Sequence, residues 1–243
     1  MATKRDPWGR RSAVIQLLLG FDVLAVPEIA HWNVPNDKGR ELFLLRPEVK
    51  SPLSVDRLIC PSVFQPEILE SKGARLVLAQ FYESIKASRA LAERPVEWPE
   101  SELNILGYWT NAQRMRSWLN KQPELEKLVR FPVAIGIFLD SATISDPLWQ
   151  TVSDGGNDPT SPTQGWSSLG YDVADRGQIS ALSDCSYASE ELIQARVHWG
   201  NSVNDCGLLN DLDASLEFKK YSDARVVEHA PFYLYEIFRL SSE

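Results

Sequence analysis

Three residues with metal-binding or nucleophilic side chains, Cys185, His198 and Cys206, lie in one stretch of the chain. They could supply three zinc ligands, but their spacing matches no standard zinc finger and the pattern lacks a fourth ligand. Cys185 and His198 could also form a nucleophile–base pair. Asp184 precedes Cys185, however, and its negative charge disfavours the thiolate. We therefore expect neither a zinc site nor a cysteine nucleophile.

Paired carboxylates are the next candidates: Glu190 with Glu191, and Asp211 with Asp213. Acid–base catalysis needs one carboxyl group with a raised pKa in an apolar cleft. Glu190 and Glu191 fall at a predicted helix start, where the helix dipole favours negative charge. Asp211 and Asp213 are two residues apart in a predicted helix, so they point in different directions. These pairs favour a solvated acidic surface over an acid–base or metal site.

The chain has three histidines, His31, His198 and His229, each in an apolar or aromatic setting that favours a structural role. The nucleotide-binding, zinc-protease and serine-hydrolase motifs are all absent from the sequence. We therefore expect no catalytic residue, no metal site, no cofactor and no enzyme activity. One alternative stays open, a hydrolase or transferase of an unfamiliar type with a pocket bordered by the long Gly/Pro/Ser loop 154–165.

The elements that must position these residues follow from hydrophobic periodicity and turn residues. Strands are expected at Ser12 to Phe21, Glu41 to Arg46, Leu103 to Trp109, Phe131 to Asp140 and Ala230 to Leu240. Helices are expected at Gln80 to Ala92, Asn111 to Val129, Ser189 to Trp199 and Leu208 to Phe218. Pro123 could break the second of these or open a further helix from Glu124 to Val129. Ser189 is expected to cap its helix, and Gly200 to stop it.

This order of elements predicts an α+β fold, with a mixed or antiparallel sheet and several flanking helices. The 243 residues can form a single α+β domain. The loop 154–165 offers an alternative split into two lobes, 1–153 and 166–243.

Charge is the strongest functional signal in the sequence. Residues 140–218 carry thirteen Asp and Glu but only two basic residues, Arg176 and Arg196, a net charge of −11. Residues 1–139 carry nineteen basic and sixteen acidic residues, so the chain's net charge of −8 is local. Such a field attracts cationic partners and repels nucleic acid. Ordinary acidic solubility is the competing interpretation.

Aromatic side chains are mixed with carboxylates in the second half of this acidic block. Aromatic anchors surrounded by charge are typical of protein interfaces, and an acidic patch speeds association with a basic partner. The residues predicted to bind a partner are Trp166, Tyr171, Asp172, Asp175, Asp184, Tyr187, Glu190, Glu191, Trp199, Asp205, Asp211 and Asp213. A general acidic protein-interaction module is the alternative to a specific inhibitor.

Three segments carry a resemblance to a known group of proteins: Gly170 to Asp175, Ile179 to Tyr187 and His229 to Leu240. They resemble bacterial immunity proteins, whose genes lie beside polymorphic toxins that include type VI secretion effectors. The closest likeness is to the immunity protein of a PAAR-containing DNase effector. The resemblance covers roughly the C-terminal third of the chain. It implies tight binding to a cognate toxin, with a basic nuclease domain as the expected partner.

The N-terminal segment and the cysteines bear on location. Ala13 to Leu19 is too short for the apolar core of a signal peptide, and no apolar run approaches the roughly 20 residues that span a bilayer. Three cysteines without a CxxC pair are typical of a reducing compartment. We expect a cytoplasmic protein that binds neither membrane nor nucleic acid.

Overall fold

A computed structural model describes residues 15–25, 45–46, 53–55, 58, 104, 108–121, 129–139, 143, 166–175, 179–182 and 187–241. In chain order the elements are β1 (Ile15–Ala25), α4 (Ala112–Leu119), β2 (Val129–Leu139), β3 (Ser167–Ala174), α7 (Ser189–Trp199), the 3-10 turn η4 (Gly200–Ser202), α8 (Leu212–Arg225) and β4 (Tyr233–Arg239). These elements confirm the predicted α+β class.

The four described strands form one antiparallel sheet in the order β1-β2-β4-β3. The last strand, β4, lies between β2 and β3 and pairs with both, for example Ile237 with Ile135 and with Gly170. The strands β1 and β2 precede residues 154–165, whereas β3 and β4 follow them. The sheet is therefore built from both sides of the segment that offered a possible split, and that segment itself lies outside the described residues.

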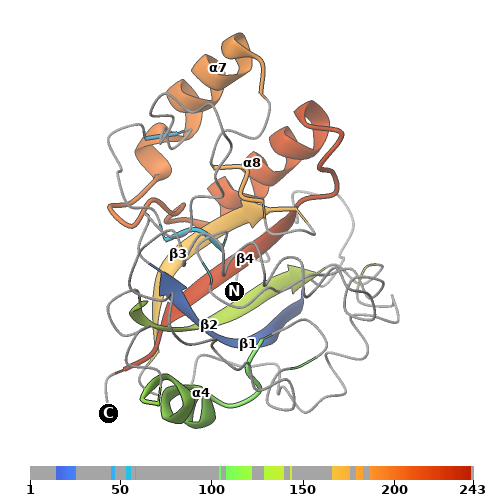
Figure 1. Ribbon diagram of the computed structural model, residues 1–243. Coiled ribbons are helices and arrows are strands. Elements are labelled where there is room, and N and C mark those ends of the chain that lie inside the picture. Colours follow the sequence, from blue (N-terminus) through green and yellow to red (C-terminus); the bar gives the residue numbers. More distant parts are fainter. Residues whose placement is uncertain are drawn as a thin grey trace, which may run out of the picture.

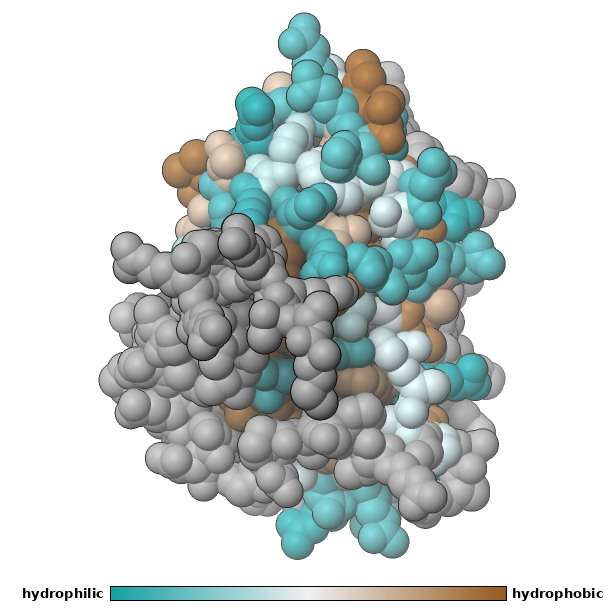
Figure 2. Space-filling model, turned by 180° about the vertical axis from the view of Figure 1, so that it is seen from behind, coloured by the Kyte–Doolittle hydropathy of each residue, from teal (hydrophilic) through white to brown (hydrophobic). Residues whose placement is uncertain are grey.

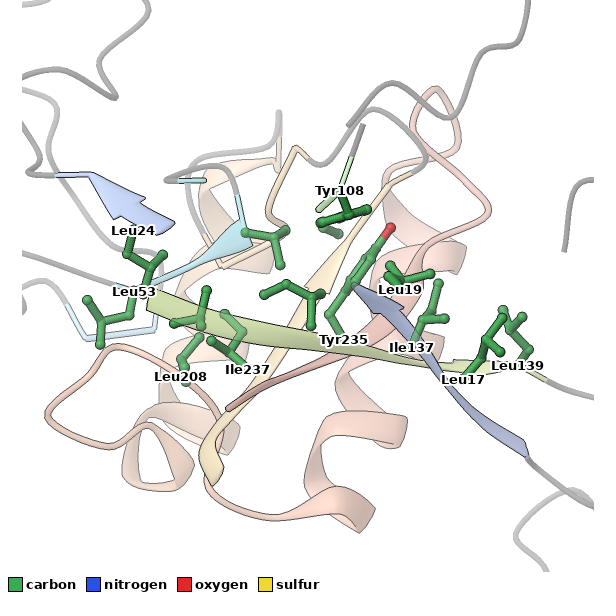
Figure 3. Close-up of a cluster of buried hydrophobic side chains, with 14 residues drawn as sticks. Leu17, Leu19, Leu24, Leu53, Tyr108, Ile137, Leu139, Leu208, Tyr235 and Ile237 are labelled. Atoms are coloured by element: carbon green, nitrogen blue, oxygen red, sulfur yellow. The ribbon is translucent and has the colours of Figure 1, made fainter. Parts of the chain in front are cut away.

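One face of the sheet carries a large buried hydrophobic cluster. Figure 3 shows side chains from β1, β2 and β4, among them Leu17, Ile137 and Tyr235, gathered on this face. Leu53 and Leu208, from segments between the elements, pack onto the same cluster. Fully burying an aliphatic or aromatic side chain contributes about 1.5–3 kcal/mol, so this cluster is a main source of stability.

The opposite face is covered at two ends by helices. At the β1 end, Met115 of α4 packs with Leu18 and Phe238. At the β3 end, Phe218 of α8 packs with Val173 and other side chains of the sheet. In Figure 1, α7 and α8 accordingly lie beyond one end of the sheet and α4 beyond the other.

Two strands contain a bulge at a glycine with positive φ, Gly20 at 141° and Gly170 at 130°. The backbone approaches closely at both. A Cβ atom on Gly20 would lie 2.6 Å from the Trp109 carbonyl oxygen, and one on Gly170 would lie 2.7 Å from the Leu209 carbonyl oxygen. The bulge also changes which residues of β1 face each cluster: Leu18 and Phe21, three apart, share one face.

Several predicted boundaries are wrong. The helix expected from Asn111 begins there, because the Asn111 side chain accepts a hydrogen bond from the Arg114 amide, but it ends at Leu119, and Val129 starts β2. The helix expected from Leu208 starts at Leu212, because Asp211 caps it and the preceding leucines are buried in extended chain.

Other predicted elements differ or fall outside the described chain. Ala188, not Ser189, is the N-cap of α7, and the Glu191 carboxylate accepts from the Ala188 amide. Trp109 forms an isolated bridge with Phe21 instead of ending a strand. The helix expected at 80–92 lies outside the described residues, as does most of the strand expected at 41–46.

Candidate protein-binding surface

The acidic block of residues 140–218 separates into three structural groups. Five of its thirteen carboxylates lie outside the described residues: Asp140, Asp146, Asp154, Asp158 and the predicted contact residue Asp184. Two are buried in the sheet region, Asp172 and Asp175. The remaining six lie between residues 187 and 217, on α7, α8 and the segment that joins them.

Asp172 is a structural residue of the interior. Its carboxylate is fully buried, accepting a hydrogen bond from the Val55 amide at 2.7 Å and one from the Ser180 hydroxyl at 2.6 Å. It thereby links β3 to the segment around Val55, which is distant in the sequence, and to the turn at Ser180 that follows the strand. The prediction that Asp172 contacts a partner at the surface is therefore corrected, because its oxygens point inward and are used by the fold.

Asp175 is also largely buried, and it joins the end of β3 to the turn after α8. One oxygen accepts from the Ile179 amide at 2.8 Å, and the other lies 2.7 Å from His229 Nδ1. A histidine oriented by a carboxylate is one part of a general-base arrangement. Through these two contacts Asp175 connects the end of β3 to Ile179 and to the turn at His229.

Two further carboxylates serve as helix caps. The Asp211 side chain accepts from the Ala214 amide at 2.9 Å and so begins α8. Glu191 lies in the first turn of α7, where one oxygen accepts from Ala188 and the other is 3.3 Å from Arg225 Nη1. Caps of this kind stabilise a helix by about 1 kcal/mol. Both residues remain at the surface. Their capping contacts account for the two carboxylates without a role in binding a partner.

The other carboxylates of this region are exposed and point into solvent. Glu190 and Asp213 lie in the first turns of their helices, and Glu217 lies one turn beyond Asp213 on α8. The Asp205 carboxylate is fully exposed and 3.3 Å from Arg46 Nη1. Glu217 was not among the residues predicted to bind a partner. Its spacing from Asp213 in a helix was enough to indicate that the two share a face.

The two helices run antiparallel to one another, which brings some of these groups together. Glu191, early in α7, contacts Arg225 late in α8, whereas His198, late in α7, lies 3.9 Å from Glu217 in the first half of α8. Arg196 is the one Lys or Arg between residues 187 and 217, and it is half-buried. The exposed charges between residues 187 and 217 are therefore acidic, whereas the second half of α8 carries Lys219, Lys220 and Arg225.

Most of the predicted aromatic anchors belong to the core. The Tyr187 hydroxyl donates to Ser222 in the interior, and Trp199 is 8% exposed, with no hydrogen-bond partner for its indole nitrogen among the described residues. Trp166 is half-buried and packs edge-on against Phe21 at 5.7 Å. These residues were predicted to contact a partner directly, but their observed packing positions the helices instead.

Tyr171 takes part in a polar row across the sheet that the sequence analysis missed. Glu236 lies on the central strand β4 and is 7% exposed. Its carboxylate accepts a hydrogen bond from the side-chain Nε2 of Gln16 at 2.6 Å. The pKa of Tyr171 is raised to about 12, first by burial and then by the negative charges of Glu236 and Asp211 and a hydrogen bond to Glu236. The sequence did contain a signal for this row, because Glu236 is a lone carboxylate in the apolar run of β4.

Gly136 makes room for this row. It is paired with Glu236, and a Cβ there would lie 3.0 Å from the Gln16 side-chain nitrogen. The row separates the cluster under α4 from the cluster under α8 on the same face of the sheet.

The surface also carries exposed apolar side chains that the sequence analysis did not single out. On α7, Ile193 is 60% exposed and Val197 is 80% exposed. They are four residues apart and so lie on one side of the helix. Figure 2 shows hydrophobic atoms standing among hydrophilic ones over the upper part of the molecule, where Figure 1 places α7 and α8.

We define the α7–α8 surface by six exposed residues that lie along the two helices: Glu190, Ile193, Val197, His198, Asp213 and Glu217. It combines acidic groups with an apolar pair, and the second half of α8 adds the basic residues Lys219, Lys220 and Arg225. Among the described residues, no three His, Cys, Asp or Glu side chains are grouped to hold a metal ion. No helix in the described part of the chain has the length and hydropathy to cross a membrane.

Comparison with protein-family models, with curated proteins and with solved structures found no match to this chain.

Proposed function

We propose that this chain is a cytoplasmic immunity protein, not an enzyme, that binds and neutralises a secreted nuclease toxin through its α7–α8 surface. The observation that carries the proposal is the exposure of Glu190, Asp213 and Glu217 within residues 187–217, a stretch without an exposed Lys or Arg that ends before the basic second half of α8. The resemblance to immunity proteins supplies the class of partner, a PAAR-containing DNase effector of a type VI secretion system.

Electrostatics support this choice of partner. Nuclease domains bind a polyanion and are commonly basic, so an acidic surface complements them. Complementary charge raises the association rate and disfavours wrong partners, including nucleic acid. An inhibitor that must act before the toxin damages its own cell benefits from a high association rate.

The buried carboxylates support the proposal indirectly. Asp172 and Asp175 are used by the fold, and Glu191 and Asp211 by helix caps. Glu190, Asp213 and Glu217 make none of these contacts. Like charges gathered on a surface repel one another, and a binding role gives a reason for them.

Co-expression with the neighbouring gene tests the proposal. Immunity proteins of this class are encoded beside their toxins, so the neighbouring gene product should arrest growth when it is produced alone in a bacterial host. Growth should recover when this chain is produced with it. A neighbouring product that is harmless alone, or one that stays toxic in the presence of this chain, would contradict the proposal.

A further inference from the structure

We infer that this chain contains one structural unit twice, and that the two units pair through β2 and β4 as the subunits of a two-fold symmetric dimer do. The first unit comprises β1, α4 and β2, and the second comprises β3, α8 and β4. The β2–β4 ladder is then the interface between the two copies. This organisation goes beyond the proposed function and does not depend on it.

Each unit begins with a strand that carries one short sequence pattern. β1 contains LGFDV at Leu19 to Val23, and β3 contains LGYDV at Leu169 to Val173. In both strands the glycine has positive φ and lies at the bulge, and the aspartate two residues later is fully buried. The two patterns therefore agree in backbone conformation and burial as well as in sequence.

An asparagine then holds a turn against that strand in the same way in each unit. Asn104 Nδ2 donates to the Leu19 carbonyl oxygen at 2.6 Å, and Asn104 Oδ1 accepts from the amide four residues later at 3.0 Å. Asn204 Nδ2 donates to the Leu169 carbonyl oxygen at 2.8 Å, and Asn204 Oδ1 accepts from the amide four residues later at 3.1 Å. The two asparagines are therefore equivalent in position and in both contacts.

The residues after each turn continue the correspondence. Trp109 exchanges two backbone hydrogen bonds with the aromatic residue of the first strand pattern, at 2.9 and 3.0 Å. Leu209 exchanges two with the aromatic residue of the second pattern, at 2.7 and 2.9 Å. Two residues further on, the side chain of Asn111 caps α4 and that of Asp211 caps α8. Bulged strand, asparagine turn, two-bond bridge and capped helix thus recur in the same order.

The spacing of the two motifs differs between the units. Gly20 and Gly170 lie 150 residues apart, whereas Asn104 and Asn204 lie 100 residues apart. More chain therefore separates strand from turn in the first unit, and no single period aligns the two copies.

The strand register places a two-fold axis at the centre of the sheet. Gly20 pairs with Ile135, Ile135 pairs with Ile237, and Ile237 pairs with Gly170, so this row is the same from either edge. The axis also exchanges the two neighbouring rows, Phe21–Ala134–Phe238–Ser168 and Tyr171–Glu236–Gly136–Leu18. Any antiparallel pair has local two-fold axes, but here the outer strands and their bulges obey the same axis. Each contact is thus made twice, as in an isologous dimer interface.

Exposed helix residues are not repeated between the units. Counted from the capping residue, Asp213 and Glu217 of α8 correspond to Gln113 and Ser117 of α4, and all four are exposed. The repeated residues are those that build the fold, whereas these two acidic residues of the α7–α8 surface are features of the second unit.

The test compares Asn104→Ala with Asn204→Ala in the full chain. Each substitution removes the donor to the strand and leaves the turn amide without its acceptor. We expect each to lower the midpoint of thermal unfolding by about 5–10 °C, with the two losses agreeing within about 3 °C. Amide hydrogen exchange should become faster at the two-bond bridge of the substituted unit in each variant.

Asn210→Ala is the matched control, because Asn210 is exposed and lies in the same segment as Asn204. It should shift the midpoint by less than about 2 °C. A loss in one asparagine variant alone, with the other behaving like the control, would overturn the equivalence of the units, as would no loss in either. If both alanine variants fail to fold, Asn104→Asp and Asn204→Asp give the same comparison, since each keeps the acceptor oxygen and loses the donor.

Discussion

Gly170→Ala should destabilise the protein by about 3–5 kcal/mol. Gly170 has φ of 130°, a conformation that side chains with a Cβ rarely adopt. The added Cβ would lie 2.7 Å from the Leu209 carbonyl oxygen and 2.9 Å from Leu208 Cβ, so the chain before α8 must move. That movement would disturb the two hydrogen bonds between Tyr171 and Leu209, at 2.7 and 2.9 Å, which hold this segment to β3. Urea unfolding measures the loss.

Gly136→Ala provides the control for this substitution. Gly136 is also in the sheet, but a Cβ there meets the end of the flexible Gln16 side chain at 3.0 Å and no backbone atom within that distance. Its expected cost is about 1 kcal/mol, for one weakened hydrogen bond to Glu236. Equal losses of stability in the Gly170 and Gly136 variants would contradict the account. Of these two glycines, Gly170 alone combines positive φ with a close backbone contact.

Asp172→Asn should lower the free energy of unfolding by about 2–3 kcal/mol. The aspartate offers an acceptor oxygen to each of two donors, the Val55 amide and the Ser180 hydroxyl. Asparagine keeps one acceptor and turns an NH₂ group towards the other donor, which leaves a buried donor without its acceptor. The midpoint of thermal unfolding should fall by about 2–4 °C for each kcal/mol.

Asp213→Asn is the matched control, with the same chemical change at an exposed site in the first turn of α8. It removes a favourable interaction with the helix dipole and should cost less than about 1 kcal/mol. If Asp172→Asn were as stable as Asp213→Asn, the carboxylate would not be holding the loop around Val55 to β3.

Hydrophobic pattern was sufficient for much of the sheet. Long apolar runs placed β1, β2 and β4 within a few residues, and the largely apolar faces of β4 indicated its burial. The pairing order was not predictable, because it depends on contacts between strands far apart in the chain. Helix ends were misplaced where a cap decided them, as at Asp211, whose side chain starts α8 three residues after Leu208.

Charge counting located the acidic region but not its exposed part. A sequence gives Asp172 and Asp213 the same charge, yet one is wholly buried and the other lies in solvent. The difference arises from the bulge at Gly170 and from segments such as Val55 that return to β3 from elsewhere in the chain. The apolar pair Ile193 and Val197 was missed for the opposite reason, since apolar residues in a predicted helix are normally assigned to the core.

The exposed acidic residues of the α7–α8 surface have one expected effect on binding kinetics. Charge at Glu190, Asp213 and Glu217 should act mainly on the rate of association, which depends on long-range attraction.

The most direct measurement is the association rate constant of the neighbouring gene product with Glu217→Lys and with Glu228→Lys at low ionic strength. Both variants change the charge equally at exposed positions, but Glu228 lies in the turn after α8 and outside the α7–α8 surface. The account predicts that Glu217→Lys slows association by about three- to tenfold, with the difference from wild type shrinking as salt is added, and that Glu228→Lys has a much smaller effect. Equal rate constants for wild type and Glu217→Lys would contradict it.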